Sequence, residues 1–456
     1  MSLILEPQQW AEEQFGNCRL GDKRRTRRLV RFAEQICRNP SGNTPMQTQR
    51  WSDCKAAYRL ISQDDVTFEA ITGPHYEATR ANAPNTTLLL NDTTEIDYGY
   101  ESVVEGLSPV GNGSCGFHLH NCLMVGPEGD VQGLAGQMIR HRKLAPKNES
   151  RTDRLKRDRE SLLWRRMVEA VGPPPEGAQW IDVCDRGADD FEVYCQMLFS
   201  QHQWVVRAQH LHRNILLDGS ENKQPLRDVV VQLPEQEMQY ELRYRSKTYG
   251  ARTATMDVRF GAITMPAPQL KSPWVRQQGI SEITMYVVEA REANPPRGVE
   301  PLHWILYTSL PVNQFEQAWK VLEYYEKRWV VEEFHKALKT GCRLDERQYR
   351  SSDRLETIAG LLSIVAVRLL QLRSAARANP NAPAKSVLPK IWIDVLKTLR
   401  PRTKVETVGA FYRQLAGLGG HLLRKSDGEP GWLTIWRGFN SLNLAIQAIQ
   451  NYNKCG

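Results

Sequence analysis

Two short runs of apolar residues, each closed by an aspartate, constrain the fold of this chain most. The first is TTLLLND at residues 86–92, and the second is WIDVCD at residues 180–185. Each run has the length of a β-strand, and the absence of alternating polar residues is typical of a strand covered on both faces. Open α/β sheets place their chemistry at such strand ends. Asp92 and Asp185 are therefore candidate functional residues.

The periodicity divides the chain into three regions. Residues 1–70 read as helices and contain a basic cluster. Residues 71–371 contain both aspartate runs, and from about 202 to 310 the periodicity switches to two, which indicates a mostly antiparallel β module. Residues 372–456 read as helices again. The expected fold class is α/β, with a β insertion and with helical N- and C-terminal domains.

Between the aspartate runs we expect two further strands and a helix. GFHLHNCLMV at 116–125 and DVQGLAGQMI at 130–139 read as strands joined by a turn. Residues 151–171, RTDRLKRDRESLLWRRMVEAV, read as one long amphipathic helix closed by Gly172. WVVRAQ, where the two-residue periodicity begins, is assigned to the β module.

A strongly charged helix is predicted at residues 324–339, YYEKRWVVEEFHKALK, which contain no Gly or Pro. Four polar residues share an arc of roughly 60° on the helical wheel: Tyr325, Arg328, Glu332 and Lys339. The opposite side carries an apolar stripe for burial: Val330, Val331, Phe334 and Leu338. On its own this helix could be a solvated face with i,i+4 ion pairs. Glu333 and His335 lie off the arc and are not expected in a site.

Three carboxylates could converge if this helix lies against the aspartate strands. Asp92, Asp185 and Glu332 would form an all-oxygen set, the hard ligand type that suits Mg²⁺ or Mn²⁺. Two such ions can drive phosphodiester displacement, with Arg328 and Lys339 gripping the phosphate. Each aspartate alone could equally be a cap. Asp97, Asp189 and Asp190, close to the pair in sequence, are expected to be solvated or capping carboxylates.

The charge distribution favours a polyanionic partner. The formal net charge is +8, and RLGDKRRTRRLVR at residues 19–31 holds seven Lys or Arg and one Asp. The nine scattered cysteines form no CxxC pair, which favours reduced thiols in a cytosolic protein. The apolar stretch at residues 358–372 is too short to span a bilayer. We therefore expect a soluble, intracellular protein without a membrane partner.

These motifs resemble the cut-and-paste DDE transposases of bacterial insertion sequences, in particular the IS-four family. The resemblance rests on the order Asp92, Asp185, Glu332 and on the signature Y-x2-R-x3-E-x6-K within residues 325–339. It extends to LGDKRRTRRLV near the start, and to VCDRGAD, PLHWILYTS and RWVVEEFHKALKTG further along.

This resemblance implies an RNase H-like catalytic core, a mixed sheet flanked by helices, interrupted by the β insertion. It implies an N-terminal domain that binds transposon-end DNA and a C-terminal dimerisation domain. The implied reactions are nicking, hairpin formation and resolution, and strand transfer into target DNA, with Mg²⁺ or in its place Mn²⁺. The partners would be double-stranded transposon ends, target DNA and a second copy of the chain. The expected location is the bacterial cytoplasm, at the nucleoid.

The resemblance also implies residue roles. Asp92, Asp185 and Glu332 would be the catalytic metal ligands. DNA contacts are implied for Tyr325, Arg328 and Lys339 at the terminal phosphates, Arg207 at the hairpin strand, Trp304 on a flipped base, and Arg24, Arg25 and Arg28 at the end sequence.

Some positions depart from the family pattern. Gly99 stands where a basic residue is expected after DTT, and the loop SPVGNGSCG lacks cations. These departures concern the DNA sequence recognised rather than the carboxylates. Two other functions stay open: a catalytically silent DNA-binding regulator, and an RNase H-fold nuclease that performs no strand transfer. Intact carboxylates argue against the first, and Trp304, Arg207 and the β insertion against the second.

Overall fold

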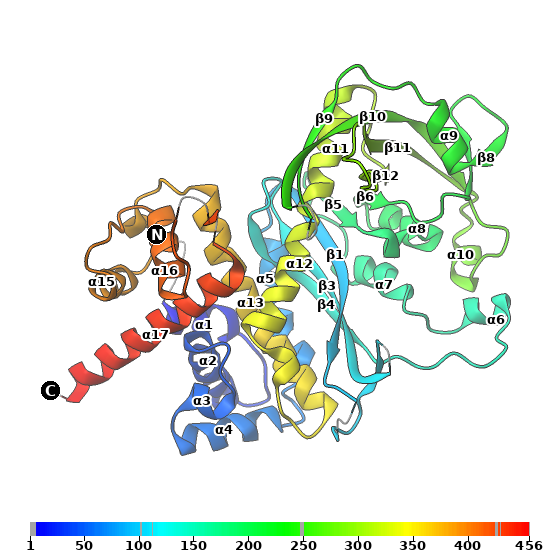
Figure 1. Ribbon diagram of the computed structural model, residues 1–456. Coiled ribbons are helices and arrows are strands. Elements are labelled where there is room, and N and C mark those ends of the chain that lie inside the picture. The colour runs from blue at the N-terminus through cyan, green and yellow to red at the C-terminus, as the bar shows by residue number, and fades with distance from the viewer. Residues whose placement is uncertain are drawn as a thin grey trace.

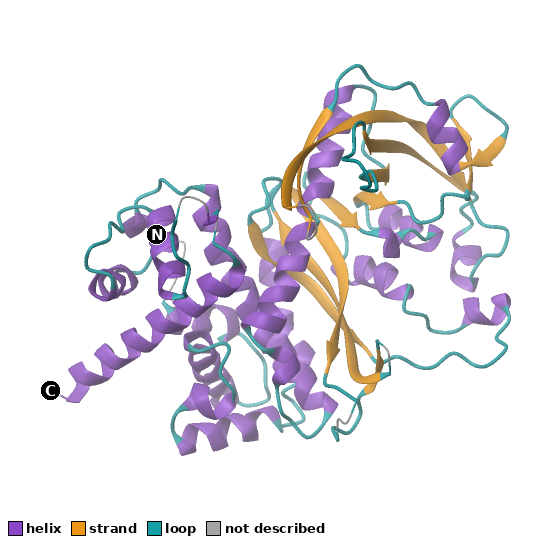
Figure 2. Ribbon diagram, in the orientation of Figure 1, coloured by secondary structure: helices purple, strands orange, loops and turns teal. Residues whose placement is uncertain are grey.

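The chain folds into a central sheet with helices from both chain ends packed on one side and a β module on the other (Figures 1 and 2). The computed structural model describes residues 6–100, 103–111, 113–246, 250–424, 427–428 and 430–455.

The central sheet is built around β1 (Thr86–Asp97). On one side β1 pairs antiparallel with β3 (Ser114–Val125), which pairs antiparallel with β4 (Val131–Arg140). On the other side β1 pairs parallel with β5 (Gln179–Cys184), which pairs parallel with β6 (Gln203–Arg207). The strand order β4-β3-β1-β5-β6, with both pairing directions, is the expected RNase H-like mixed sheet, so the predicted fold class is confirmed.

The assignment of WVVRAQ to the β module is wrong, because β6 is the fifth strand of the core. A short apolar run fits an inner core strand and an insertion strand equally well, and only its parallel pairing with β5 separates the two. The insertion therefore begins after Arg207. Its strands are β7 (Asn214–Leu217), β8 (Lys223–Pro225), β9 (Tyr240–Ser246), β10 (Gly250–Pro266), β11 (Glu282–Glu292) and β12 (His303–Thr308).

The insertion does not form a separate sheet. β12 pairs antiparallel with β6, so core and insertion share one 12-stranded sheet. The short helices α9 (Leu226–Gln232) and α10 (Pro273–Gln278) complete the module, and β2 (Ser108–Val110) extends the core beside β3.

Helices cover both faces of the core. α7 (Leu162–Val171) and α8 (Phe191–Phe199) lie on one face, and α5 (Phe68–Ala81), α12 (Trp329–Lys336) and α13 (Ser352–Ala378) lie on the other (Figure 1). This two-sided cover explains the unbroken apolar run of β1, whose leucines are all buried.

The predicted single helix at 151–171 is wrong. α6 (Arg151–Lys156) ends at Arg157, and α7 starts anew at Leu162. The side chains between the two helices form ion pairs with residues outside this segment. The Arg157 guanidinium pairs with Glu149, and the Asp158 carboxylate accepts from Arg140 at 2.6 Å. These ion pairs hold an extended segment where helix propensity alone favours continuation.

The two chain ends form neighbouring helical groups. The first contains α1 (Pro7–Phe15), α2 (Lys23–Arg38), α3 (Thr44–Thr48) and α4 (Trp51–Ile61). The second contains α14 (Ala384–Val387), α15 (Lys390–Leu399), α16 (Val408–Leu418) and α17 (Trp432–Cys455). α17 runs beside the N-terminal helices, with an Asn440–Ser41 hydrogen bond of 2.8 Å (Figure 1).

Among the described residues, the segment Ser352–Ser374 of α13 is long and apolar enough to cross a membrane by length and composition. Its window is 89% buried inside the protein. The apolar character of α13 is therefore explained by packing, because α13 lies between the sheet and the terminal helices and contacts α5 and α2.

Arg347 fastens the N-terminal helices to the core. Its buried guanidinium donates to the carbonyls of Gly42, Pro40 and Cys342, each at 2.7 Å. These carbonyls belong to segments about 300 residues apart in sequence. One side chain therefore satisfies buried acceptors on both sides of the contact.

We predict that Arg347→Met destabilises the protein by about 3 kcal/mol, because it removes the donor to the Gly42 and Cys342 carbonyls and the shorter of the two bonds to Pro40. Equilibrium urea denaturation measures the change. The matched control is Arg350→Met, since the Arg350 side chain is exposed and should change stability little. Equal effects of the two substitutions would contradict the anchoring role.

Candidate active site

Asp92 and Asp185 lie next to each other across the central pair of strands. The parallel ladder of β1 and β5 ends at the pair Asn91–Cys184, so each aspartate directly follows the last paired residue. Asp92 was predicted to end its strand, and this prediction is wrong. β1 continues to Asp97 along β3, and only the ladder with β5 stops.

The period of two in a strand decides which way these aspartates face. Leu88 and Leu90 pack in the core cluster that contains residues of α12 and α13, whereas Leu89 packs against α7 on the opposite face. Asp92 continues the row of Leu88 and Leu90 and therefore faces α12. Asp185 continues the corresponding row of β5 in the same way.

Glu332 comes from α12, which is not part of one uniform helix. α11 (Phe315–Lys327) ends before Arg328, whose N–H bonds the Tyr325 carbonyl three residues back at 3.1 Å. A wider π turn, Ala337–Gly341, follows α12. The apolar stripe still docks, because Val331, Phe334 and Leu338 are fully buried. The predicted continuous helix at 324–339 is thus corrected to two helices and a π turn.

One guanidinium lies between two of the carboxylates. Arg328 Nη1 is 3.6 Å from Asp92 Oδ2 and 3.5 Å from Glu332 Oε1. Burial, followed by the charges of Asp185 and Glu332, raises the pKa of Asp92 to about 7, against the opposing effect of Arg328. The charges of Asp185 and Glu332 therefore act on Asp92, and Arg328 offsets part of their effect. Such an excess of half-buried negative charge fits a divalent cation.

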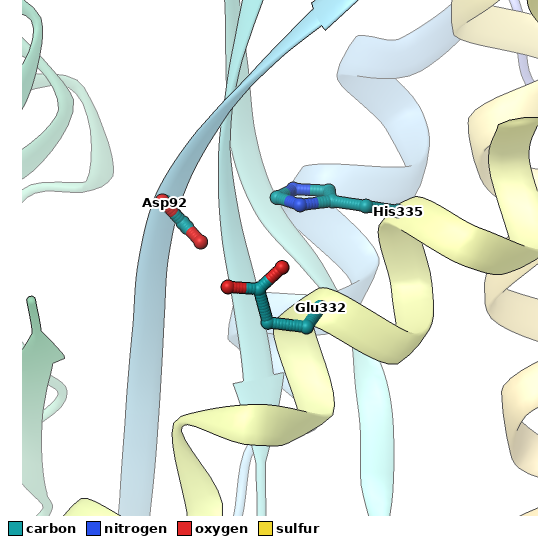
Figure 3. A group of neighbouring side chains, drawn as sticks. All are labelled: Asp92, Glu332 and His335. Carbon is teal, nitrogen blue, oxygen red and sulfur yellow. The ribbon is translucent and has the colours of Figure 1, made fainter. Parts of the chain in front are cut away.

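His335 joins this cluster, although it was not expected there. Ligand atoms of Asp92, Glu332 and His335 all lie within 4.8 Å of one another, and Figure 3 shows the imidazole directed toward both carboxylates. The spacing of three residues from Glu332 places His335 on the same helix face, a signal that the four-residue arc obscured. Asp185 is outside this group of described residues. Its Oδ1 caps the 3-10 turn Arg186–Ala188 by accepting the Gly187 N–H at 2.8 Å.

A hollow of about 870 Å³ opens beside the carboxylates, between the core and the β insertion. Tyr325, Trp304, Arg207 and Arg328 all line it, and the Tyr325 and Trp304 rings meet edge to face at 5.1 Å. Burial raises the pKa of Tyr325, and the Arg207 and Arg328 charges oppose that shift. Arg207, expected on the insertion, lies at the end of core strand β6.

The hollow also contains residues that were not predicted. Trp329 lines it with 58% of its surface exposed, and the Arg328 guanidinium lies 5.2 Å from its ring centre. Arg186, directly after Asp185, lines the hollow as well. Both residues flank signature positions, so sequence adjacency was the available signal.

Lys339 lies in the π turn, half-buried. The acidic groups that act on it are, in order, Asp345, Glu95, Asp97 and Glu332, while burial lowers its pKa. Lys339 therefore lies within the electrostatic range of Glu332 and of the acidic end of β1.

The three N-terminal arginines expected to contact DNA differ in their freedom. Arg24 is 85% exposed and pairs with Asp22 at 2.8 Å. Arg25 and Arg28 are partly buried, and each is held by a carboxylate of a different segment, Asp65 and Asp53. Arg24 is thus the one of the three whose charge is most available.

Two of the three neighbouring aspartates are capping carboxylates, as expected, whereas the expectation that Asp189 is solvated or capping is wrong. Asp97 accepts the Gly99 N–H at 2.8 Å, and Asp190 caps α8. Asp189 is buried and pairs with Arg213. These carboxylates are already engaged away from the cluster.

Two stretches of the chain match known protein families. Residues 7–66 match the family described as transposase DNA-binding, and residues 182–368 match the transposase DDE domain. A solved structure of the piggyBac transposase synaptic complex with hairpin DNA is 9% identical, with 96% of this chain and 85% of that chain covered at a TM-score of 0.40. The matched DDE domain contains Asp185, Glu332 and the strands around them, and the matched N-terminal domain contains the basic helix α2. The chain thus contains a transposase DDE domain at residues 182–368 and a transposase DNA-binding domain at residues 7–66.

Proposed function

We propose that this transposase performs cut-and-paste transposition of an IS-four-type element: nicking, hairpin formation and resolution at the inverted-repeat ends, then strand transfer into target DNA. The observation that supports this proposal is the convergence of Asp92, Asp185 and Glu332, from distant segments, around Arg328.

Asp92, Asp185 and Glu332 would hold Mg²⁺, or Mn²⁺ in its place, because oxygen ligands suit these ions and Arg328 compensates only part of the negative charge around Asp92. Divalent cations bound there would activate the attacking oxygen and stabilise the leaving oxygen of a phosphodiester displacement. Asp185 would reach the site by releasing the Gly187 N–H that it now accepts.

The cationic and aromatic residues would position the DNA. Arg328 is held between Asp92 and Glu332, where its remaining N–H groups can donate to a non-bridging phosphate oxygen. Tyr325 and Lys339 would bind the same terminal strand. Each of these residues acts on the substrate rather than on the bond being broken.

The hollow beside the carboxylates would receive an extruded base. Its volume of about 870 Å³ is in the range of small-molecule pockets, and Trp304 and Tyr325 offer aromatic surfaces for stacking. Arg207 at its edge would bind the backbone of the hairpin strand. This use of the hollow explains why the β insertion carries aromatic and cationic side chains toward the core.

The terminal regions would supply DNA binding and pairing. Residues 1–70 would bind the inverted-repeat end, and residues 372–456 would form the homodimer interface. α17 supports the second role because Leu444 and Tyr452 are 59% and 81% exposed. A dimer would bring two ends into one synaptic complex. The free cysteines of the described chain suit the bacterial cytoplasm, where we place the protein beside the nucleoid.

Glu332→Gln should abolish cleavage of a labelled duplex carrying the cognate ends, because it removes a carboxylate ligand. End binding, measured by gel shift, should stay within a few fold. Glu333→Gln is the matched control, since the Glu333 carboxylate pairs with Arg373 away from the cluster. Wild-type protein should give hairpin products. Simple nicks would indicate a nuclease, and binding without cleavage a regulator.

Asp92→Asn should raise the melting temperature of the cation-free protein at pH 8 by several degrees. The carboxylate pKa rises from 3.8 to about 7 on folding, so the unfolded chain loses this proton first as pH increases. Wild-type stability therefore falls between those two values, and the variant escapes that loss. Thermal unfolding in chelator at pH 5 and pH 8 provides the measurement. A variant advantage that is as large at pH 5 as at pH 8 would contradict the assigned charge cluster.

Arg24→Ala should weaken end binding and reduce the slope of log affinity against log salt by about 1, as for one lost phosphate contact. Fluorescence anisotropy over a salt series gives this slope. Arg413→Ala, an exposed arginine on α16, serves as the control and should leave the slope unchanged. An unchanged slope in Arg24→Ala would remove Arg24 from the DNA interface.

A further inference from the structure

The acidic cluster contains a histidine, His335, that could either bind a metal ion or donate a hydrogen bond to the carboxylates. A nitrogen of His335 lies within 4.8 Å of carboxylate oxygens of Asp92 and Glu332, the arrangement of a site with one nitrogen and two oxygen ligands. The alternative is that the ring N–H is a hydrogen-bond donor to the carboxylates. The contacts on the other edge of the ring distinguish these roles.

The other edge of the His335 ring meets an amide. His335 Nε2 is 3.1 Å from Asn121 Nδ2, in the interior of the protein. Asn121 is the residue of β3 paired with Asp92, and it points to the same face. The same amide nitrogen also donates to the Leu119 carbonyl at 3.0 Å. Turning the amide over would place two oxygens against each other there, so the nitrogen faces His335.

A chain of buried hydrogen bonds holds Asn121 in that orientation. Its Oδ1 accepts from Gln137 Nε2 at 2.5 Å, and the same nitrogen of Gln137 is 3.1 Å from Ser363 Oγ. Gln137 Oε1 accepts from the Tyr76 hydroxyl at 3.0 Å. Along this hydrogen-bond chain, every amide N–H faces an acceptor and every amide oxygen faces a donor. The direction of donation therefore runs from Tyr76 on α5, across β4 and β3, to His335.

This direction fixes the tautomer of the imidazole. Nε2 of His335 receives a proton donor, so Nε2 carries the lone pair and Nδ1 carries the hydrogen. A metal-binding histidine instead donates its second ring N–H to a carboxylate, carbonyl or water. The second ring nitrogen of His335, Nε2, instead accepts a hydrogen bond from Asn121. The nitrogen left for the cluster therefore offers an N–H and no lone pair.

We propose that His335 is a positioning residue, held as its Nδ1–H tautomer by the Tyr76–Gln137–Asn121 hydrogen-bond chain, that presents this N–H to the Asp92 and Glu332 carboxylates and is not a metal ligand. The role of His335 in DNA cleavage rests on the proposed function, whereas the assignment of its tautomer rests on the hydrogen bonds alone. Donation from the neutral ring orients the two carboxylates without adding a positive charge. The chain also ties their geometry to α5 and α13, through Tyr76 and Ser363.

Two spectroscopic measurements on the full-length protein test the tautomer and the ligand role without any cleavage assay. In cation-free protein labelled with ¹⁵N-histidine, the His335 signal, identified by its loss in His335→Asn, should show a protonated Nδ1 and an unprotonated Nε2. With Mn²⁺ bound, the electron spin-echo modulation of the wild-type protein should show no directly coordinated ¹⁴N that is lost in His335→Asn. An unprotonated Nδ1, or such a coordinated nitrogen, overturns the proposal.

Conservative replacement tests the positioning role. Asparagine places an amide N–H near the position of Nδ1, whereas glutamine places its amide near Nε2. Cleavage of cognate ends should fall by about tenfold or more in His335→Gln and His335→Ala, and should be largely retained in His335→Asn. Rescue by glutamine instead of asparagine overturns the positioning role. Absence of cleavage in wild-type protein would instead remove the proposed function and leave the two spectroscopic tests in force.

Discussion

Repulsion within a group of half-buried carboxylates is the constraint on which this structure depends. Burial and the charges of Asp185 and Glu332 raise the pKa of Asp92, and Arg328 offsets only part of this effect. Such a cluster persists only where the surrounding fold fixes it. The rest of the molecule can be understood as the frame that holds these groups together and leaves room beside them for DNA.

Hydrogen bonds on one face of the sheet and apolar packing on the other hold the frame together. Behind the aspartates, Asn91 donates to the buried Asp182 carboxylate at 2.7 Å, and Asp182 also binds His202 at 2.7 Å. These bonds hold β1 against β5 at the point where their ladder ends. On the opposite face, α12 docks through its apolar stripe and brings Glu332 and Arg328 over Asp92. The catalytic geometry is therefore set by strands and helices, with the long insertion adding substrate contacts at the edge.

Sequence reasoning recovered the parts of this design that depend on local patterns. Apolar runs ending in Asp92 and Asp185 predicted two buried core strands, and the apolar stripe of the charged helix predicted which of its faces docks. It failed where tertiary pairing decides. WVVR has no local feature that assigns β6 to the core, and ion pairs of Arg157 and Asp158 break a segment that favours a helix. The tight turn at Arg328 and the π turn after α12 change the helical phase. Lys339 therefore lies beyond the regular helix, and the four-residue arc left out His335, which lies three residues after Glu332 on the same face of α12.

The central claim, that the three acidic side chains together hold divalent ions, is tested most directly by anomalous diffraction from crystals soaked in Mn²⁺. The account predicts a strong manganese peak bridging oxygens of Asp92 and Glu332, with the Asp185 carboxylate turned from its cap toward the ion. Manganese bound elsewhere, or no peak between these carboxylates at saturating Mn²⁺, would contradict it.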